Sequence, residues 1–457
     1  MGSDHPNRGA PMSRTTLLVD FYWTRDKDPR IPLGHASILT AMRTQNLDVR
    51  SIVVAVNDGQ LDVGQVVQSI LDAVQGIPPS DVDLAFGAYV WGEELLQEVL
   101  RRVRAAGFEG RIILGGPQIS YSQGGLEAIY PHADAFVRGY GEEAMVQLAR
   151  TSERRAITGV HWAGPLDLVQ QANIDLGSLP SPWLTGTIPL KDQKFIRWET
   201  QRGCQFRCAF CQHREAGARL KRRELDLPRI EAEIELFCKS DVRDIAVLDP
   251  IFNASPHATA ILQRFKALSY TGRLSLQCRA ELMDENFIDA ASELDVRLEF
   301  GLQTIHSAEM TAIRRNNHMP KVDEAFAQTL QRGIDFEVSL IFGLPEQTLA
   351  SFMESVEWCL ERHVPVIKVF PLMLLRGTGL ERDRAKWNLR DSGGAMPMVI
   401  GSASFDREEW RQMARISEAL RLTEGAHPGT IEELVDIANT LEPDILRWAP
   451  EQQGRAA

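Results

Sequence analysis

Three cysteines, Cys204, Cys208 and Cys211, stand within a segment of eight residues. A CxxxCxxC spacing on a loop lets three thiolates bind three irons of a cubane [4Fe–4S] cluster, one cysteine to each iron. The fourth iron then has no protein ligand and keeps an open coordination position, as a catalytic metal must. The spacing therefore predicts a cluster that reacts rather than one that only carries electrons.

An open iron of this kind can bind S-adenosylmethionine (SAM) through its amino and carboxylate groups. One electron passed from the cluster to the sulfonium breaks a C–S bond and gives methionine and a 5′-deoxyadenosyl radical. The three cysteines thus predict both a cluster and SAM as cofactors.

Two other interpretations of the cysteines are a zinc site and ordinary core packing. Zinc prefers four ligands from paired CxxC motifs, and the sequence has no second pair. Chance packing is not expected to place Gly203 before the motif and Phe210 inside it. The remaining cysteines, Cys238, Cys278 and Cys359, are scattered in apolar segments and are expected to be buried small hydrophobic residues.

The elements that must position this loop form a series of strand-like and helical segments in the second half of the chain. Six strands joined by helical crossovers predict a partial (β/α)6 barrel over 195–380, too few strands to close. The strands are expected at Ile196–Thr200, Ile245–Asp249, Leu274–Arg279, Leu298–Gln303, Glu337–Phe342 and Ile367–Leu372. Helices are expected at Pro228–Ser240, Pro256–Leu268, Asp284–Leu294, Ser307–Arg315, Lys321–Arg332 and Leu349–His363.

No strong strand signal follows the barrel, and the region 381–457 is predicted to be helical, at Asp406–Thr423 and Thr430–Leu441. We expect a linker at 153–194, where Pro180, Pro182 and Gly186 interrupt the periodicity.

The first part of the chain, 13–152, predicts a separate doubly wound, Rossmann-like α/β domain. Its strands are expected at Thr16–Phe21, Ser51–Val56, Val82–Ala88, Arg111–Gly115 and Ala135–Arg138. The turn Gly115-Gly116-Pro117 follows the fourth strand, at the sheet edge where open α/β sheets bind ligands.

Charge and composition narrow the partners. The chain has a formal net charge of −12 and no block of Lys or Arg, so we expect no nucleic-acid partner. No apolar run is long enough to span a bilayer and no signal peptide is evident, so a cytoplasmic protein without a membrane partner is expected. An acidic surface favours a cationic small-molecule substrate, although it also serves solubility alone.

With these motifs in place, residues 195–375 resemble the radical SAM superfamily. The resemblance implies that Phe210 contacts adenine and that Asp249 or Asn253 binds the SAM amino group. It also implies SAM contacts from Arg279 in the segment Gln277–Glu281, and from Glu299 or Gln303 near the ribose or carboxylate. The segments Ser339–Glu346 and Phe370–Met373 resemble the fifth and sixth strand signatures.

The same polar residues could instead form an internal ion-pair network. Most of them stand at the carboxyl ends of strands, where α/β barrels place their active sites, and this favours function. Of the barrel-top carboxylates Asp249, Glu281 and Glu299, we expect Asp249 and Glu281 to act as catalytic acid or base. Substrate contacts are also expected from His213 and Glu215, which follow the cysteines.

Residues 15–150 resemble the cobalamin-binding domain that precedes the barrel in one large radical SAM subgroup. The resemblance rests on Pro32–Leu39, on Gly115-Gly116-Pro117, which would contact the cofactor, and on Arg138–Glu143. The chain lacks the Asp-x-His-x-x-Gly motif that supplies a cobalt-ligating histidine, and His35 is the only histidine near the proposed face. Whether cobalamin binds is therefore left open.

Three reactions remain to be compared. A radical diol dehydratase, of the kind that begins deoxygenation of an aminoglycoside in antibiotic biosynthesis with a separate reductase, fits the short C-terminal region and the acidic charge, and is preferred. The alternative is a cobalamin-dependent C-methyltransferase, the commonest activity in the subgroup. An iron–sulfur electron carrier or sensor is the third and would not need the polar strand ends. The enzymatic interpretations imply an electron donor such as flavodoxin or ferredoxin.

Overall fold

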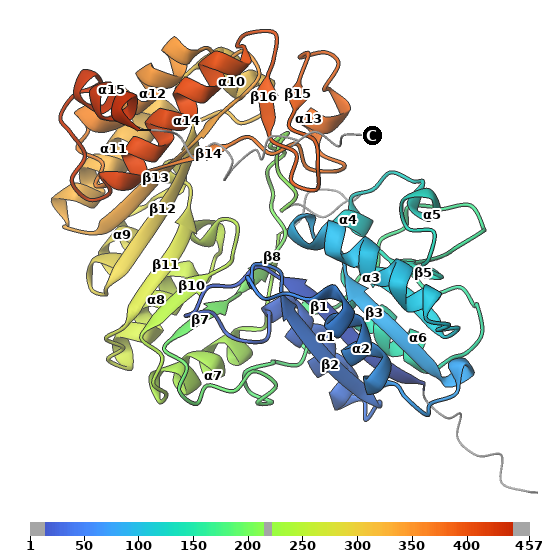
Figure 1. Ribbon diagram of the computed structural model, residues 1–457. Helices are drawn as coiled ribbons and strands as arrows, with labels where there is room; N and C mark the ends of the chain where they lie inside the picture. Colours follow the sequence, from blue (N-terminus) through green and yellow to red (C-terminus); the bar gives the residue numbers. More distant parts are fainter. Residues whose placement is uncertain (1–13, 214–221, 442–457) are drawn as a thin grey trace, which may run out of the picture. The chain divides into compact units, whose positions relative to one another are not determined.

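The computed structural model describes residues 14–213 and 222–441. Its contacts divide the chain into two compact units, Met1–Pro189 and Leu190–Ala457 (Figure 1). Both units are α/β, as predicted. The domain limits proposed from the sequence stay a prediction.

The first unit is built on a six-stranded sheet with the order β2-β1-β3-β4-β5-β6. Its strands are β1 (Thr15–Tyr22), β2 (Val49–Ala55), β3 (Val82–Gly87), β4 (Arg111–Gly115), β5 (Ala135–Val137) and β6 (Val160–Trp162). The first five are parallel, and they match the five strands predicted from the sequence. The antiparallel β6 was not predicted and lies within the stretch taken as a linker. It is as short as β5, but β5 is an unbroken apolar run whereas β6 contains a histidine.

Helices cover both faces of this sheet (Figure 1). They are α1 (Leu33–Thr44), α2 (Val63–Ala73), α3 (Glu93–Ala105), α4 (Pro117–Ser120), α5 (Leu126–Ile129) and α6 (Gly141–Ala149). One apolar core holds Val67 of α2 and Leu96 of α3 against the sheet, and a second holds Leu39 of α1 and Met145 of α6. The inner strands β1 and β3 are thus buried on both faces, as in other doubly wound parallel sheets, whereas the edge strand β2 is partly exposed.

The second unit carries a parallel six-stranded sheet with the order β14-β13-β12-β11-β10-β7. Its strands are β7 (Phe195–Trp198), β10 (Asp244–Val247), β11 (Arg273–Cys278), β12 (Val296–Gln303), β13 (Asp335–Phe342) and β14 (Val366–Pro371). In the described ranges the two outer strands β7 and β14 do not pair with each other, so the barrel is partial, as predicted. A short pair, β8 (Gln201–Arg202) with β9 (Arg223–Glu224), flanks the cysteine loop.

The crossovers of this barrel are helical and lie on its outer side (Figure 1). They are α7 (Leu227–Cys238), α8 (Ala258–Ala267), α9 (Glu285–Ser292), α10 (Ser307–Ala312), α11 (Met319–Gln331) and α12 (Leu349–Glu361). Every one of them coincides with a helix predicted from the sequence, because their amphipathic periods are long and regular.

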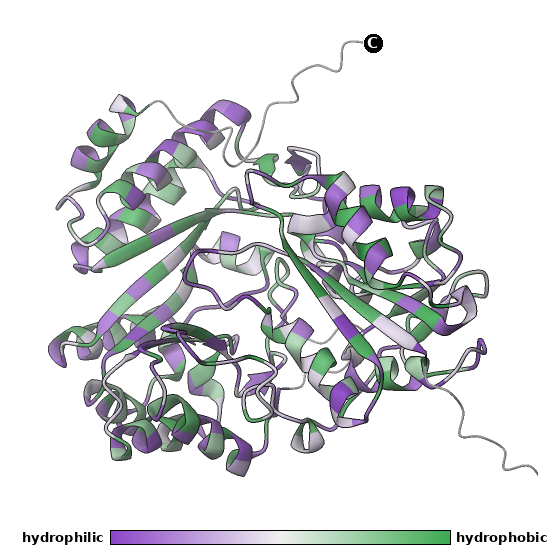
Figure 2. Ribbon diagram, turned by 60° about the horizontal axis from the view of Figure 1, so that its bottom comes forward, coloured by the Kyte–Doolittle hydropathy of each residue, from purple (hydrophilic) through white to green (hydrophobic). Residues whose placement is uncertain are grey.

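The barrel strands differ from those of the first unit in being buried on one face only. Buried and half-buried residues alternate along β11, β12 and β13, so every second side chain points away from the helices. Figure 2 shows this alternation as green and purple bands along the barrel strands. The inner face of the barrel therefore carries polar side chains.

The region after the barrel contains α13 (Gly379–Arg382), β15 (Arg390–Asp391), β16 (Val399–Gly401), α14 (Arg407–Leu422) and α15 (Ile431–Thr440). The two predicted helices correspond to α14 and α15. The expectation of no strands was wrong, since β15 and β16 form an antiparallel pair that is too short to show a period. No helix within residues 14–213 and 222–441 is both long and apolar enough to cross a bilayer.

Candidate active site

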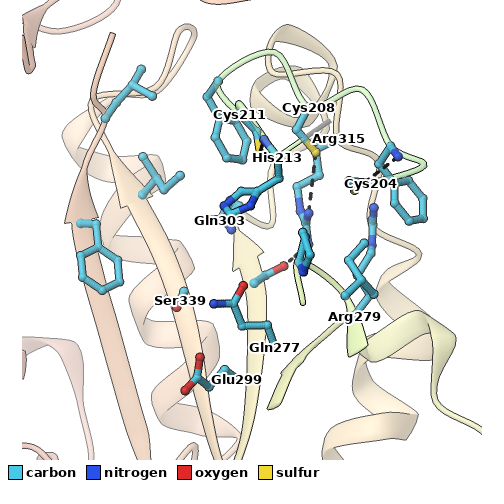
Figure 3. Close-up of a pocket in the computed structure, with 18 of the residues that line it drawn as sticks. Cys204, Cys208, Cys211, His213, Gln277, Arg279, Glu299, Gln303, Arg315 and Ser339 are labelled. Atoms are coloured by element: carbon cyan, nitrogen blue, oxygen red, sulfur yellow. Dashed lines mark hydrogen bonds between the residues drawn. The ribbon is translucent and has the colours of Figure 1, made fainter. Parts of the chain in front are cut away.

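A cavity of about 470 Å³ lies against the inner face of the barrel strands. All three predicted cluster cysteines line it, together with residues of β11, β12, β13 and β14. Figure 3 shows the three cysteines at one end of this cavity and Gln277, Ser339 and Glu299 farther along the strands. Its volume is in the range of sites that enclose small ligands.

Backbone contacts hold the cysteine loop from two sides. The amide of Ala209 donates to the carbonyl of Ile313 at 2.7 Å, and the amide of Leu380 donates to the carbonyl of Ala209 at 2.9 Å. Gly203 enters the loop with a φ of 80°, a conformation that glycine adopts without strain. Gly379 allows close packing, because a Cβ there would lie 3.1 Å from the Cβ of Ala209.

Each thiol accepts a hydrogen bond. The Sγ of Cys204 accepts from the amide of Phe206 at 3.5 Å, and the Sγ of Cys211 accepts from the amide of His213 at 3.3 Å. The Sγ of Cys208 accepts from Nη1 of Arg315 at 3.8 Å. Burial raises the pKa of Cys204 and raises that of Cys211 to about 12, so metal binding at these two thiols must release their protons.

The donor set fits a cubane cluster better than a single ion. Among the described residues, no group of three His, Cys, Asp or Glu side chains converges on one point as a single metal ion requires. A cubane cluster takes one cysteine for each of three irons, so its thiols are spread over one face of the cluster. The three thiols of the cysteine loop match this arrangement. A fourth cysteine that lines the cavity, Cys278, stands on β11 rather than on the loop and is buried.

A row of polar side chains crosses three adjacent barrel strands. Gln277 on β11 is in register with Glu299 on β12, which is in register with Glu337 on β13. One step closer to the strand ends, Gly301 is in register with Ser339. These five residues all line the cavity.

The two glutamates of this row sit in an environment that favours their neutral forms. Burial raises the pKa of Glu299. Burial, followed by repulsion from Glu299, raises the pKa of Glu337 to about 7, although Lys368 and Arg297 oppose the rise. Near neutral pH the pair can therefore hold a proton that it can also give up.

Gln303 occupies a strained position at the end of β12. Its φ is 73°, which is unusual for a residue with a Cβ, and the register between β12 and β13 shifts between Gly301 and Gln303. A Cβ on Gly301 would lie 2.9 Å from Nε2 of Gln303, so this glycine leaves room for the Gln303 side chain to fold over the strand. Backbone strain of this kind is common where a ligand is bound.

The structure separates the site residues predicted from the sequence into two groups. Those that line the cavity are Cys204, Cys208, Cys211, Phe210, Arg279, Glu299 and Gln303. Those that are not among its lining residues are Asp249, Asn253 and Glu281. Of the expected substrate contacts, His213 lines the cavity, whereas Glu215 lies outside the described residues.

The side chain of Asp249 faces the backbone of Thr200 and Gln201 rather than the cavity. Its buried carboxylate accepts hydrogen bonds from the amide of Thr200 at 2.8 Å and the amide of Gln201 at 3.2 Å, and also from the Thr200 hydroxyl. Burial raises its pKa to about 7. These contacts fix the segment that leads into the cysteine loop, so the geometry gives Asp249 a positioning role rather than the expected acid–base role.

Asn253 and Glu281 both form hydrogen bonds with Arg279. The side-chain amide of Asn253 donates to the Arg279 carbonyl at 2.9 Å and its oxygen accepts from the Arg279 amide at 3.1 Å. Glu281 accepts from Nε of Arg279 at 3.0 Å. The Arg279 guanidinium lies 4.0 Å from the ring centroid of Phe206. These contacts hold Arg279 at the cavity, whereas Asn253 and Glu281 do not line it.

Two residues of the site were missed by the sequence analysis. Arg315 follows α10 and reaches Cys208, and Glu337 had been counted only as the start of a strand. A signal for Glu337 was present, since it stands two residues before Ser339 and therefore on the same strand face. Nothing local marks Arg315, because its contact with Cys208 joins positions 107 residues apart.

In the first unit, the residues predicted to contact a cofactor lie at the carboxyl edge of the sheet. Gly116 has a φ of 97°, and a Cβ there would lie 2.8 Å from the carbonyl oxygen of Ala88, so this glycine serves close packing of the edge loops. At Gly115 a Cβ would lie 3.7 Å from the carbonyl oxygen of Val137, an ordinary contact, so packing does not require glycine there. His35 is buried and bonds Ser51 through Nε2 at 2.7 Å. Burial lowers its pKa to about 4.

The same edge also presents apolar surface. Trp23 follows β1 and is 53% exposed, and Trp91 follows β3 and is 39% exposed. In a sheet of order 2-1-3-4-5 the edge between β1 and β3 is where the strand order reverses and ligands bind. These tryptophans offer apolar surface to a macrocycle such as a corrin, and the ring of His35 is engaged by Ser51.

Comparison with known proteins finds a family match within the second unit. Residues 198–359 match the model of the Radical SAM superfamily. The 2-(S-pantetheinyl)-carbapenam-3-carboxylate methyltransferase of Streptantibioticus cattleyicolor is 26% identical over 391 residues, which cover 75% of this chain and 57% of that protein. The cobalamin-dependent radical SAM methyltransferase TokK of Streptomyces tokunonensis is 26% identical over 65% of this chain and 47% of its own length. The chain thus spans about half the length of these curated relatives.

Solved structures give the same fold for both units. The radical SAM methyltransferase TsrM of Kitasatospora setae has a TM-score of 0.67 at 17% identity, over 88% of this chain and 83% of that chain. The cobalamin-dependent radical enzyme OxsB has a TM-score of 0.67 at 13% identity, over 96% of this chain and 74% of that chain. The predicted combination of a cobalamin-binding-like domain with a radical SAM barrel is confirmed at the level of the fold.

Proposed function

Because residues 198–359 are a radical SAM domain, with the [4Fe–4S] cluster and SAM that such a domain implies, we propose that this chain is a cobalamin-dependent radical SAM methyltransferase. The observation that carries the proposal is the set of three thiols in a cavity that is also lined by the polar side chains of Gln277, Glu299 and Glu337. The two relatives described above, both methyltransferases, favour methyl transfer over the dehydration expected from the sequence.

Each group of cavity residues has a part in this reaction. Cys204, Cys208 and Cys211 hold the cluster. When bound, the cluster with SAM supplies a 5′-deoxyadenosyl radical, and cobalamin supplies the methyl group. We assign Gln303 and Ser339 to the polar groups of SAM, because both line the cavity between the thiols and the glutamate pair.

The remaining wall suits the substrate. Glu299 and Glu337 present two carboxyl groups to the cavity, and Gln277 adds an amide beside them. A small polar substrate with a protonated amine would gain hydrogen bonds and charge compensation from this row. An aminoglycoside remains one example of that class, and the acidic pair is what supports it.

The test is product analysis after anaerobic reconstitution with iron, sulfide, SAM, a reductant and hydroxocobalamin. We expect 5′-deoxyadenosine and S-adenosylhomocysteine together, corrin retained in stoichiometric amount, and a substrate that gains the mass of one methylene. Turnover without any corrin, with unchanged yield, would overturn the proposal. An external one-electron donor such as flavodoxin or ferredoxin would replace the chemical reductant.

Radical dehydration of a diol stays a second candidate because of one feature. Loss of a hydroxyl group needs a proton donor, and Glu337, with its pKa raised to about 7, can provide a proton near neutral pH. Under this candidate the product loses the mass of water, no S-adenosylhomocysteine forms, and corrin has no effect. A separate reductase would then complete the deoxygenation. The same incubation therefore distinguishes the two reactions.

A further inference from the structure

Arg315 is a buried cation placed between the cysteine loop and the barrel. It follows α10, is 8% exposed, and lines the cavity. One terminal nitrogen, Nη1, donates to the Sγ of Cys208 at 3.8 Å, and the other, Nη2, donates to the carbonyl of Gly301 on β12. Figure 3 shows its side chain extending along the cavity toward Cys208.

The charge of Arg315 is not neutralised by a partner. In the described part of the chain, no Asp or Glu forms an ion pair with it, although Arg279 close by is paired with Glu281 and the adjacent Arg314 is paired with Asp383. Burial lowers the pKa of Arg315, with a smaller contribution from Arg279, but a guanidinium keeps its proton in proteins. A full positive charge therefore stands beside one thiol of the site.

Such a charge acts on the electron affinity of whatever metal the thiol binds. Reduction of a cluster adds one negative charge, and a nearby cation stabilises the reduced form more than the oxidised form. Hydrogen bonds to the sulfur ligands act in the same direction, and together they set much of the range of iron–sulfur potentials. The low exposure of Arg315 keeps solvent from screening the effect.

We propose that Arg315 is a positioning residue that raises the reduction potential of the cluster held by Cys204, Cys208 and Cys211. The charge makes the cluster easier to reduce by a cellular one-electron donor, at the step that precedes SAM cleavage. The carbonyl of Gly301 fixes the second terminal nitrogen, so that the first stays on the sulfur. This inference rests on the radical SAM domain and is independent of whether the radical is used for methylation or dehydration.

The test compares two neighbouring arginines in the full-length, cluster-loaded protein without SAM. Arg315→Gln removes the cation beside Cys208, whereas Arg314→Gln removes an equal charge whose side chain is 53% exposed and paired with Asp383. The cluster potential is measured by a redox titration followed by electron paramagnetic resonance. We expect the ratio of reduced to oxidised cluster at a fixed potential to fall about tenfold in Arg315→Gln, which is a shift of about 59 mV for one electron, and to be unchanged in Arg314→Gln.

The proposal would be overturned if the ratio of reduced to oxidised cluster in Arg315→Gln stayed within twofold of the wild-type ratio. Equal shifts of the potential in Arg315→Gln and Arg314→Gln would overturn it as well. Iron and sulfide content is determined for each protein, to separate a change in potential from a loss of cluster. If Arg315→Gln does not hold a cluster, Arg315→Lys decides instead. Its ammonium keeps the charge but has a single nitrogen for two acceptors, so we expect a smaller decrease of the same sign. A decrease of tenfold or more in the same ratio would show that the charge does not set the potential and would count against the proposal.

Discussion

Strands β1 and β12 both have eight residues and both lie inside a parallel sheet, yet seven residues of β1 are buried whereas those of β12 alternate between buried and half-buried. The helices of the first unit cover both faces of its sheet. In the second unit they cover one face and leave the other to line a cavity. A sheet packed on both faces can bind ligands only at its edge, whereas a sheet covered on one face can place polar groups along its strands.

This difference locates the chemistry. In the second unit, Glu299, Gly301 and Gln303 stand at alternate positions of one strand and all line the cavity. In the first unit, the candidate residues His35 and Gly116 lie in loops or at a helix start, and both are engaged by their own chain. The barrel thus contains a site of its own, while the first unit offers a surface at the edge of its sheet.

The largest effect is expected at the cysteine loop. Cys208→Ala removes one of three cluster ligands, so the visible cluster absorption and the formation of 5′-deoxyadenosine should both be lost, by about a hundredfold or more. The first unit should keep its hydrogen-exchange protection, because its cores do not include the loop. If Cys208→Ala still bound as much iron and sulfide as the wild type, the cluster ligands would have been assigned to the wrong residues.

The next effect tests how the two sheets are packed. Leu84→Ala in β3 removes a fully buried side chain, and we expect it to lower the free energy of unfolding of the first unit by about 3 kcal/mol. Gln277→Ala on the inner face of β11 should lower that of the second unit by under about 1 kcal/mol, while weakening substrate binding. Hydrogen exchange measures the stability of each unit separately. If Leu84→Ala and Gln277→Ala lowered the free energy of unfolding of their units equally, the two sheets would not differ in packing as described.

A smaller effect concerns pH. The pKa of Glu337 rises from 4.5 to about 7 on folding, so between these values the folded chain binds a proton that the unfolded chain releases. The free energy of unfolding must then fall as pH rises through this window. Glu337→Gln should remove the fall and be more stable than wild type at pH 8 by about 3 kcal/mol, with little difference at pH 4.5.

The control for this prediction is Glu354→Gln, which changes a side chain that is 60% exposed on α12. Thermal unfolding across the pH range, followed by circular dichroism, measures both variants. If Glu337→Gln and wild type show the same pH profile, the glutamate row does not hold an extra proton, and the acid–base role proposed for it fails.

The smallest effect is expected at the edge of the first sheet. His35→Asn removes the ring that bonds Ser51. Because the imidazole is buried and engaged, it cannot also bind cobalt, so we expect corrin retained after desalting to stay within about twofold of wild type. A loss of corrin with a changed visible spectrum would instead identify His35 as a cobalt ligand. The first unit would then also contain a cofactor site made of its own side chains.

Much of the fold followed from local patterns. The helices α7 to α12 were predicted because long amphipathic periods depend on residues three or four apart. The strands β6, β15 and β16 were missed because two or three residues give only a weak local signal, and their pairing depends on partners elsewhere in the chain.

The candidate site was predicted only in part. Glu299, Gln303 and Arg279 stand at strand ends, and position along a strand is a local property. Asp249 also follows a strand, but its carboxylate is bound to Thr200 and Gln201. The direction of a side chain at a strand end depends on which donors surround it, and these come from neighbouring strands.

The sequence by itself determined the cluster, because three cysteines on one short loop carry their geometry in their spacing. It also determined the two α/β units, since the alternation of strand and helix periods is written along the chain. Only the tertiary structure decided that Arg315 meets Cys208 and that Glu337 stands beside Glu299. These contacts join residues far apart in the sequence, and they arise from the register and curvature of the assembled sheet, which no local pattern specifies.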